Sequence, residues 1–178
     1  MVASTDDFIK MTATEAVARL RSKEVSPLDL VEASIRRIET IDTEVNALPI
    51  HCFDQARDQA KTLDLERHTA NPKSLCGLPI AVKDYNDLGG VITTYGSPIF
   101  ANNVAQKSDA TVRKLQSNGA IAVAKSNVPE WAGGHTFNPV NGLTRNPWDM
   151  RKSAGGSSGG SGAALASGLV WLATGNDL

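Results

Sequence analysis

The stretch LPIAV, residues 78–82, decides the fold that the sequence predicts. It is a short apolar run bounded by Gly77 and Asp84, which is typical of a buried strand. A second apolar run, AIAVA at residues 120–124, follows a helix-like segment over residues 110–117. A strand, a helix and another strand in succession predict an α/β fold.

Helices are predicted on the N-terminal side of these strands. The motif SPLD, residues 26–29, offers an N-cap serine, a proline at the first helical position and an acidic residue at the third. A shorter apolar stripe follows Thr12, and a third helix is predicted over residues 53–63. We therefore expect one domain, with a mostly helical segment over residues 1–65 and the start of an α/β core over residues 66–178.

The composition excludes several classes of partner. The 178 residues are 41% hydrophobic and 21% charged with a formal net charge of −1, and only 5% are aromatic, which argues against a nucleic-acid partner. The longest apolar stretch, residues 163–173, is too short to span a membrane, and Met1 to Lys10 contains no apolar signal segment. The two cysteines form no disulfide framework. We therefore expect a cytoplasmic protein that binds neither nucleic acid nor a membrane.

The most unusual segment is GGSSGGSG, residues 155–162, which follows a predicted loop over residues 138–148. One interpretation is a flexible linker or a plain turn. This fits poorly, because the tract passes directly into an apolar segment, residues 163–172, that is predicted to pack as a helix. The other interpretation is a backbone-lined site for an anion or an oxyanion, although the tract lacks the Lys-Ser/Thr of a P-loop. The residues alone leave both interpretations open.

Lys83 is the second unusual feature, because it follows an apolar strand where the chain should still be leaving the core. An ordinary lysine at a strand end would extend its ammonium to solvent. A buried lysine is instead shifted toward its neutral form, and it can then act as a base that activates a hydroxyl. The histidines, His51, His68 and His135, are widely spaced and form no metal-ligand pattern. We therefore expect neither a metal nor another cofactor.

Several sequence blocks, in the same order, resemble those of the amidase-signature hydrolases. GLPIAVKD at residues 77–84 resembles the lysine strand of that family, and SDATV at residues 108–112 resembles the start of its following helix. KSNVPE at residues 125–130, NGLTRNPWD at residues 141–149 and the Gly/Ser tract complete the match. The resemblance implies an α/β/α fold, in which helices flank a mixed β-sheet behind a helical N-terminal segment, and it implies that this chain holds that fold incompletely.

The same resemblance implies a Ser–cis-Ser–Lys triad that hydrolyses carboxylic amides to an acid plus ammonia or an amine through an acyl-enzyme. By motif position, Lys83 would be the base and Ser157 the serine of the cis peptide that relays the proton. Ser158 and Asp177 are candidates to support this network. In the family, the nucleophilic serine directly follows a segment that resembles TGNDL, residues 174–178. We therefore expect it just beyond this chain, and we expect these residues alone to be inactive.

The resemblance also bears on substrates and partners. It places Trp131 and Ala132 in a loop that lines the acyl pocket and Leu178 beside the oxyanion site, whereas core packing is an equally good interpretation of Trp131. We expect a small-molecule amide as substrate, and the resemblance is compatible with a homodimer. Two alternatives stay open, namely the glutamine-hydrolysing subunit of a tRNA-dependent amidotransferase and a truncated, non-catalytic product.

Overall fold

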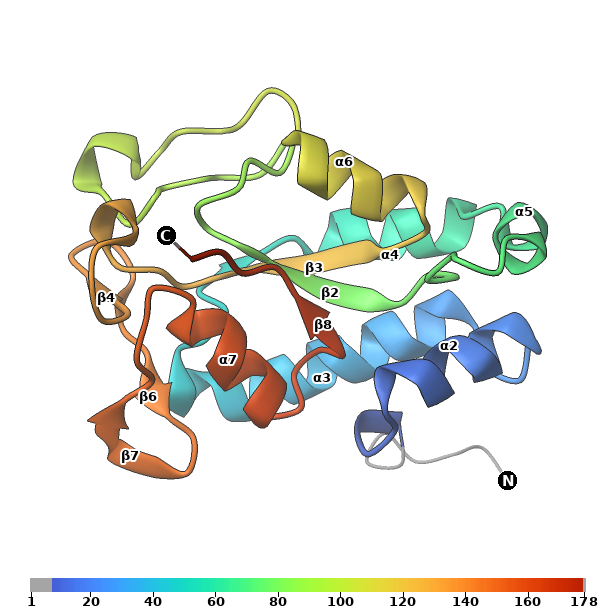
Figure 1. The fold of residues 1–178 in the computed structure, drawn as a ribbon, viewed down its shortest axis with the longest axis horizontal. Coiled ribbons are helices and arrows are strands. Elements are labelled where there is room, and N and C mark those ends of the chain that lie inside the picture. The colour runs from blue at the N-terminus through green and yellow to red at the C-terminus, as the bar shows by residue number, and fades with distance from the viewer. Residues whose placement is uncertain (1–7, 178) are drawn as a thin grey trace.

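The computed structural model describes residues 8–177, which form a four-stranded sheet with helices on both sides (Figure 1). Residues 1–7 and Leu178 lie outside the described part. The predictions made for most of the segment from Met1 to Lys10, and for Leu178 beside the oxyanion site, therefore fall outside it as well. No helix within the described part is long and apolar enough to cross a membrane.

The sheet has the strand order β1-β3-β2-β8. Its central strands, β2 (Pro79–Lys83) and β3 (Ile121–Ser126), are parallel and are joined through α6 (Ala110–Ser117). At the edges, β8 (Leu172–Ala173) runs parallel to β2, and β1 (Ile50–His51) runs antiparallel to β3. The sheet is therefore mixed, which confirms the predicted α/β fold. The predicted helical segment over residues 1–65 also contributes one edge strand.

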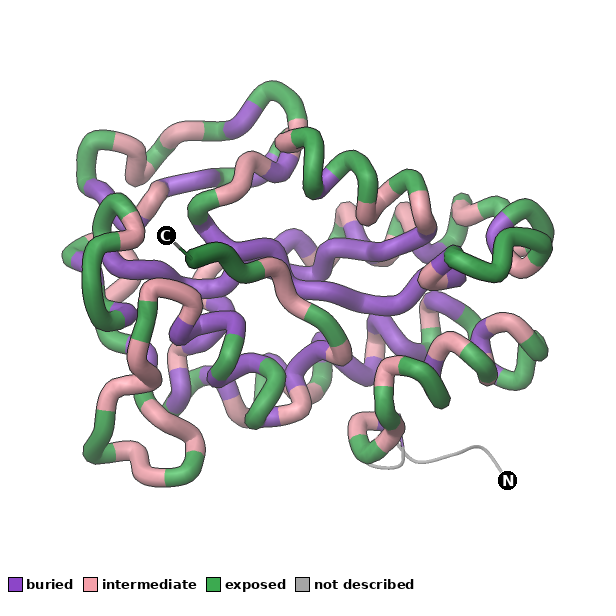
Figure 2. The backbone as a smooth tube through the Cα atoms, in the orientation of Figure 1, coloured by how far each residue is buried: buried purple, intermediate pink, exposed green. Residues whose placement is uncertain are grey.

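Both faces of the two central strands are covered, and both strands are buried throughout (Figure 2). Neighbouring side chains of a strand point to opposite faces, so an apolar run without alternation fits a strand packed on both sides. On one face, residues of β2 and β3 pack with Val112 of α6. On the other face, they pack with α3 (Pro27–Val45), α4 (Phe53–Thr62) and α7 (Gly159–Ala166). The site described below lies where β2 leaves this core.

The first helices begin at the predicted residues. Thr12 forms a capping box at the start of α2 (Ala13–Arg21), and Ser26 forms another at the start of α3. In the second box, the Asp29 N–H donates to the Ser26 hydroxyl at 3.2 Å, and the Ser26 N–H donates to the Asp29 carboxylate at 2.9 Å. Each box satisfies two backbone donors that a helix start would otherwise leave unpaired. A short helix, α5 (Leu65–Ala70), completes the N-terminal helices.

The prediction of a plain loop over residues 138–148 is wrong, because this region takes part in two small hairpins. Two-residue strands are too short to show the alternation by which a strand is recognised in a sequence. The paired strands are β4 (Phe137–Asn138) with β5 (Gly142–Leu143), and β6 (Arg145–Asn146) with β7 (Asp149–Ser153).

The helix predicted over residues 163–172 is also misplaced. The observed helix α7 begins four residues earlier, inside the Gly/Ser tract, and ends at Ala166. Gly168 has a φ of 66°, a left-handed conformation that glycine adopts without steric cost, and it turns the chain out of the helix. The chain then pairs with β2 as β8, at Leu172 and Ala173. Pairing with a distant strand therefore overrides the local helical preference of these apolar residues.

Candidate active site

The site is built where the end of β2 meets the start of α7. Lys83 is the last residue of β2, and its side chain is buried. Its Nζ atom lies 2.8 Å from the Ser157 hydroxyl and 2.9 Å from the Ser158 hydroxyl. The peptide bond between Gly156 and Ser157 is cis, as the resemblance implies. The structure thus brings together three of the predicted site residues, and Lys83 does not extend to solvent.

Glycines let the Gly/Ser tract lie directly against the segment around Thr136. A Cβ atom at Gly156 would lie 2.1 Å from the carbonyl oxygen of Gly134, and one at Gly159 would lie 2.3 Å from the hydroxyl of Thr136. The Gly159 N–H also donates to this hydroxyl at 3.0 Å, and the Thr136 N–H donates to the Gly155 carbonyl at 2.8 Å. The tract is therefore a packed, hydrogen-bonded segment and not a linker.

The surroundings of Lys83 favour a neutral amine. Burial lowers the pKa of the Lys83 ammonium, and the negative charge of Asp177 acts in the opposite direction. The backbone N–H of Lys83 donates to the Thr174 hydroxyl at 2.7 Å, and the Thr174 N–H donates to the Ala81 carbonyl at 3.0 Å, so the strand end is held in place. A neutral lysine Nζ at hydrogen-bond distance from a serine hydroxyl can take the proton of that hydroxyl.

A cavity of about 380 Å³ opens beside Ser157. Its walls include three more of the predicted site residues, Trp131, Ala132 and Asp177. The Trp131 side chain is 49% exposed, so it lines this cavity and is not a core residue. Ser158 connects the site to the same wall, because the Asn176 N–H donates to its hydroxyl at 3.3 Å.

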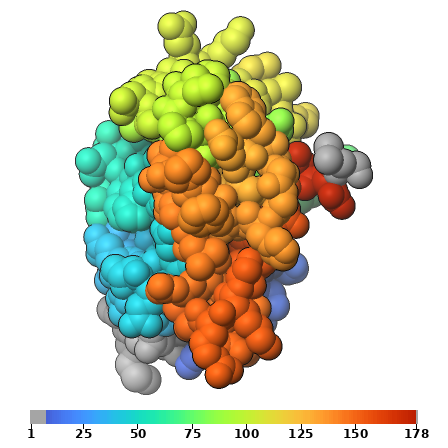
Figure 3. Space-filling model, turned by 90° about the vertical axis from the view of Figure 1, so that its left-hand side faces the viewer, coloured from blue at the N-terminus to red at the C-terminus, as the bar shows by residue number. Residues whose placement is uncertain are grey.

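Both tyrosines of the chain belong to an aromatic cluster behind this cavity. The ring of Tyr95 stacks on that of Trp131, with centroids 5.8 Å apart, and both rings meet Phe100 edge to face. Tyr85 packs edge to face on Tyr95 and also lines the cavity. In Figure 3, the yellow-green segment near residue 100 lies beside the orange segment near residue 130, on one face of the molecule. The short turns η1 (Pro98–Phe100) and η2 (Glu130–Ala132) carry Phe100 and Trp131 into this cluster.

The comparisons with known proteins agree with this arrangement. Residues 29–178 match the family model described as Amidase. The chain belongs to the amidase family. The predicted resemblance to the amidase-signature hydrolases is thereby confirmed. This amidase chain is 41% identical over 150 residues to a putative amidase AmiB2 of Mycobacterium bovis, which covers 83% of the chain and 32% of the relative.

Two further relatives show the range of the family. One subunit of the glutamyl-tRNA(Gln) amidotransferase of Desulfatibacillum aliphaticivorans is 37% identical over 169 residues, which cover 94% of this amidase chain and 35% of the relative. The structure of a 6-aminohexanoate cyclic dimer hydrolase complexed with substrate matches with a TM-score of 0.83 and 30% identity, over 93% of this chain and 33% of that one. The amidase chain thus spans about a third of the length of the relatives that it matches.

The histidines and cysteines of the amidase chain stay apart from Lys83. His51 stacks on Phe53, and buried His68 shares a hydrogen bond of 2.8 Å with Ser74. His135 lines the cavity. Across residues 8–177, no group of three or more His, Cys, Asp or Glu side chains is arranged to hold a metal ion. Both cysteines are free and buried.

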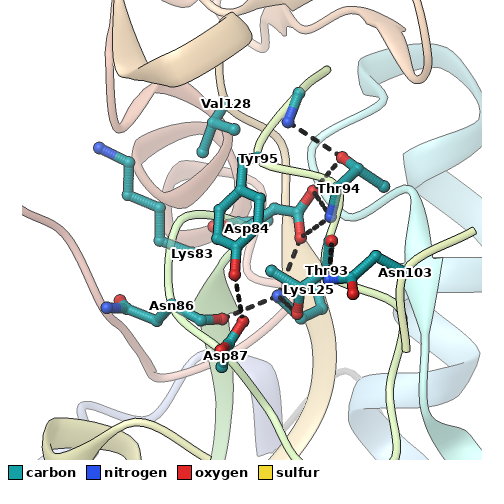
Figure 4. Close-up of polar contacts among 12 residues, drawn as sticks. Lys83, Asp84, Asn86, Asp87, Thr93, Thr94, Tyr95, Asn103, Lys125 and Val128 are labelled. Atoms are coloured by element: carbon teal, nitrogen blue, oxygen red, sulfur yellow. Dashed lines mark hydrogen bonds and ion pairs between the residues drawn. The ribbon is translucent and has the colours of Figure 1, made fainter. Parts of the chain in front are cut away.

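Sequence reasoning missed one buried ion pair beside the site. Lys125 Nζ lies 2.8 Å from a carboxylate oxygen of Asp84, and both side chains are fully buried (Figure 4). The signal that would have found Lys125 was present, because it follows the apolar run at residues 120–124 just as Lys83 follows the run at residues 78–82. Two lysines in the same local pattern thus occupy the ends of the two central strands of the amidase chain.

Proposed function

We propose that this chain supplies the general base and the proton relay of an amidohydrolase, which cleaves carboxylic amides to an acid plus ammonia or an amine. One observation carries the proposal. Buried Lys83 holds its Nζ atom 2.8 Å from the Ser157 hydroxyl, beside a cavity of about 380 Å³. Such a pair can move a proton, and a cavity beside it can hold a small amide.

The mechanism that we propose moves one proton out along this pair and back again. Neutral Lys83 takes the proton of the Ser157 hydroxyl while Ser157 takes the proton of a nucleophilic serine. The activated serine attacks the amide carbonyl, and Ser157 returns the proton to the leaving amine as the C–N bond breaks. Water then attacks the acyl-enzyme by the same route and releases the acid. We place the nucleophilic serine in the part of the complete enzyme that follows residue 178.

A second candidate is the glutamine-hydrolysing subunit of a tRNA-dependent amidotransferase. The identity of 37% to the glutamyl-tRNA(Gln) amidotransferase relative favours it, and it acts on an amide by the same chemistry. The identity to the putative amidase is slightly higher, at 41%, and the matched part of the chain shows no feature specific to the amidotransferase. We therefore keep hydrolysis of small amides as the main proposal.

Purified complete enzyme tests this choice. We expect it to release ammonia or amine from at least one class in a panel of aliphatic and aryl carboxamides, without any partner protein. Added hydroxylamine should divert the acyl group to a hydroxamate, because an acyl-enzyme can be attacked by this stronger nucleophile. Ammonia release from glutamine that requires co-purified partner proteins and tRNA would favour the second candidate. No amide cleavage under either condition would contradict both.

The protonation of Lys83 predicts how the activity depends on pH. Because burial lowers the pKa of Lys83 and only the neutral amine can accept a proton, kcat/KM should rise with pH and level off. The midpoint of this rise should lie below the ordinary lysine value of about 10.4. Asp177 raises the pKa of Lys83, so Asp177→Asn should move the midpoint to lower pH. A midpoint that rises or stays fixed in this variant would contradict the assignment.

A further inference from the structure

The buried pair of Asp84 and Lys125 has no part in the proton transfers proposed above. Both side chains are 0% exposed, and Lys125 Nζ lies 2.8 Å from Asp84 Oδ1. Removing two charges from water is costly, and apolar residues in place of a buried ion pair often leave a protein equally stable or more stable. The free energy of unfolding therefore gives no account of this pair. Its contacts do.

The ammonium of Lys125 fixes the turn that follows the proposed base. Besides Asp84, it donates to the carbonyl of Asn86 at 2.8 Å and to the hydroxyl of Thr93 at 2.6 Å, so each of its three protons has a partner. The Asn86 N–H in turn donates to the carbonyl of Lys83 at 2.8 Å. Lys125 thus holds the chain where it leaves Lys83.

The carboxylate of Asp84 fixes the wall of the cavity. It accepts hydrogen bonds from the backbone N–H of Thr94 at 3.2 Å and from the Thr94 hydroxyl at 2.5 Å. The next residue, Tyr95, accepts the backbone N–H of Trp131 at 2.9 Å and stacks its ring on the indole. The Tyr95 hydroxyl also donates to Asp87 at 2.7 Å, in the same turn that Lys125 holds. One ion pair therefore links the base-bearing turn to the aromatic wall.

The direction of the side chains keeps this pair separate from the proton relay. Figure 4 shows the Lys83 side chain pointing away from Asp84 and Lys125, as expected for neighbouring residues at a strand end. The carboxylate of Asp84 is occupied by Lys125 and Thr94, so it is committed to the wall and not to the proposed base.

We propose that Asp84 and Lys125 are positioning residues, which hold the turn after Lys83 and the wall formed by Tyr95 and Trp131 in one fixed relative geometry. This inference rests on the proposed amide hydrolysis. A displacement of about 1 Å between catalytic groups and substrate can lower a rate about 100-fold, so an ordered link between base and pocket matters for kcat.

The double variant Asp84→Asn with Lys125→Met, made in the complete enzyme, tests the proposal. It removes both charges together, and the asparagine can still accept from the Thr94 N–H, so no buried charge is left uncompensated. The methionine cannot hold the Asn86 carbonyl. We expect kcat for amide hydrolysis to fall about 10- to 100-fold, while the melting temperature stays within a few degrees of the parent. A matched control is Glu32→Gln with Arg57→Met, which removes the 2.7 Å ion pair between α3 and α4 and should leave kcat unchanged.

A second pair of variants gives a readout that a purely structural role would not move. Thr94→Val removes the hydroxyl that donates to Asp84, whereas Thr94→Ser keeps it. We expect Thr94→Val to raise KM several-fold, because the wall shifts, and Thr94→Ser to restore the parent KM. This pair also serves as the test if the double variant does not fold.

The outcomes separate the two proposals. Parent kcat in the folded double variant, or a lower melting temperature with parent kcat per folded enzyme, would overturn the positioning role. So would equal KM values in the two Thr94 variants. Parent turnover after replacement of Lys83 would instead overturn the proposed function itself.

Discussion

Replacing Lys83 with alanine in the complete enzyme is expected to lower kcat for amide hydrolysis by about a thousandfold. The reason is geometric and electrostatic. Lys83 is buried with its Nζ atom 2.8 Å from the Ser157 hydroxyl, and burial favours the neutral amine that this role needs. Without it, the nucleophile keeps its proton at the moment of attack. The measurement is steady-state release of ammonia or amine from the best substrate of the carboxamide panel.

Two controls make this result specific to Lys83. Lys152→Ala removes a lysine whose side chain is 71% exposed and should leave kcat unchanged. Melting curves should show that the Lys83→Ala enzyme is folded, because the substitution removes a costly buried amine. Turnover within a fewfold of the parent in folded Lys83→Ala enzyme would exclude Lys83 as the base.

The second large effect that we expect concerns stability, at Gly160 in the first turn of α7. A Cβ atom at this position would lie 2.4 Å from the backbone nitrogen of Asn127, 2.5 Å from its carbonyl oxygen and 2.9 Å from the carbonyl oxygen of Ala47. All three neighbours are backbone atoms, which cannot turn away as a flexible side chain can. We therefore expect Gly160→Ala to destabilise the complete enzyme by about 3 kcal/mol, measured by chemical denaturation.

The same helix contains a matched control. Gly162 is exposed, and a Cβ atom there would meet nothing within 4 Å. Gly162→Ala should therefore stabilise the enzyme by about 0.5–1 kcal/mol, because alanine loses less backbone entropy than glycine in a helix. If the two substitutions had equal effects on the free energy of unfolding, the close contact between α7 and the residue after β3 would be excluded.

The sequence by itself determined the central elements of this protein. The unbroken apolar runs at residues 78–82 and 120–124 indicated strands buried on both faces, and the SPLD motif located the start of α3. These predictions succeeded because the burial of a central strand and the capping of a helix start are set by neighbouring residues. The motif order likewise sufficed to indicate the family.

Only the tertiary structure decided the rest. Sequence spacing could not show that Lys83 meets Ser157 across 74 residues, that Lys125 pairs with Asp84, or that residues 172–173 leave a helical pattern to pair with β2. In each case the partner is distant along the chain, and the contact exists because the parallel strands β2 and β3 end at the same edge of the sheet. Local preference sets which elements form, whereas packing between distant elements sets which side chains meet.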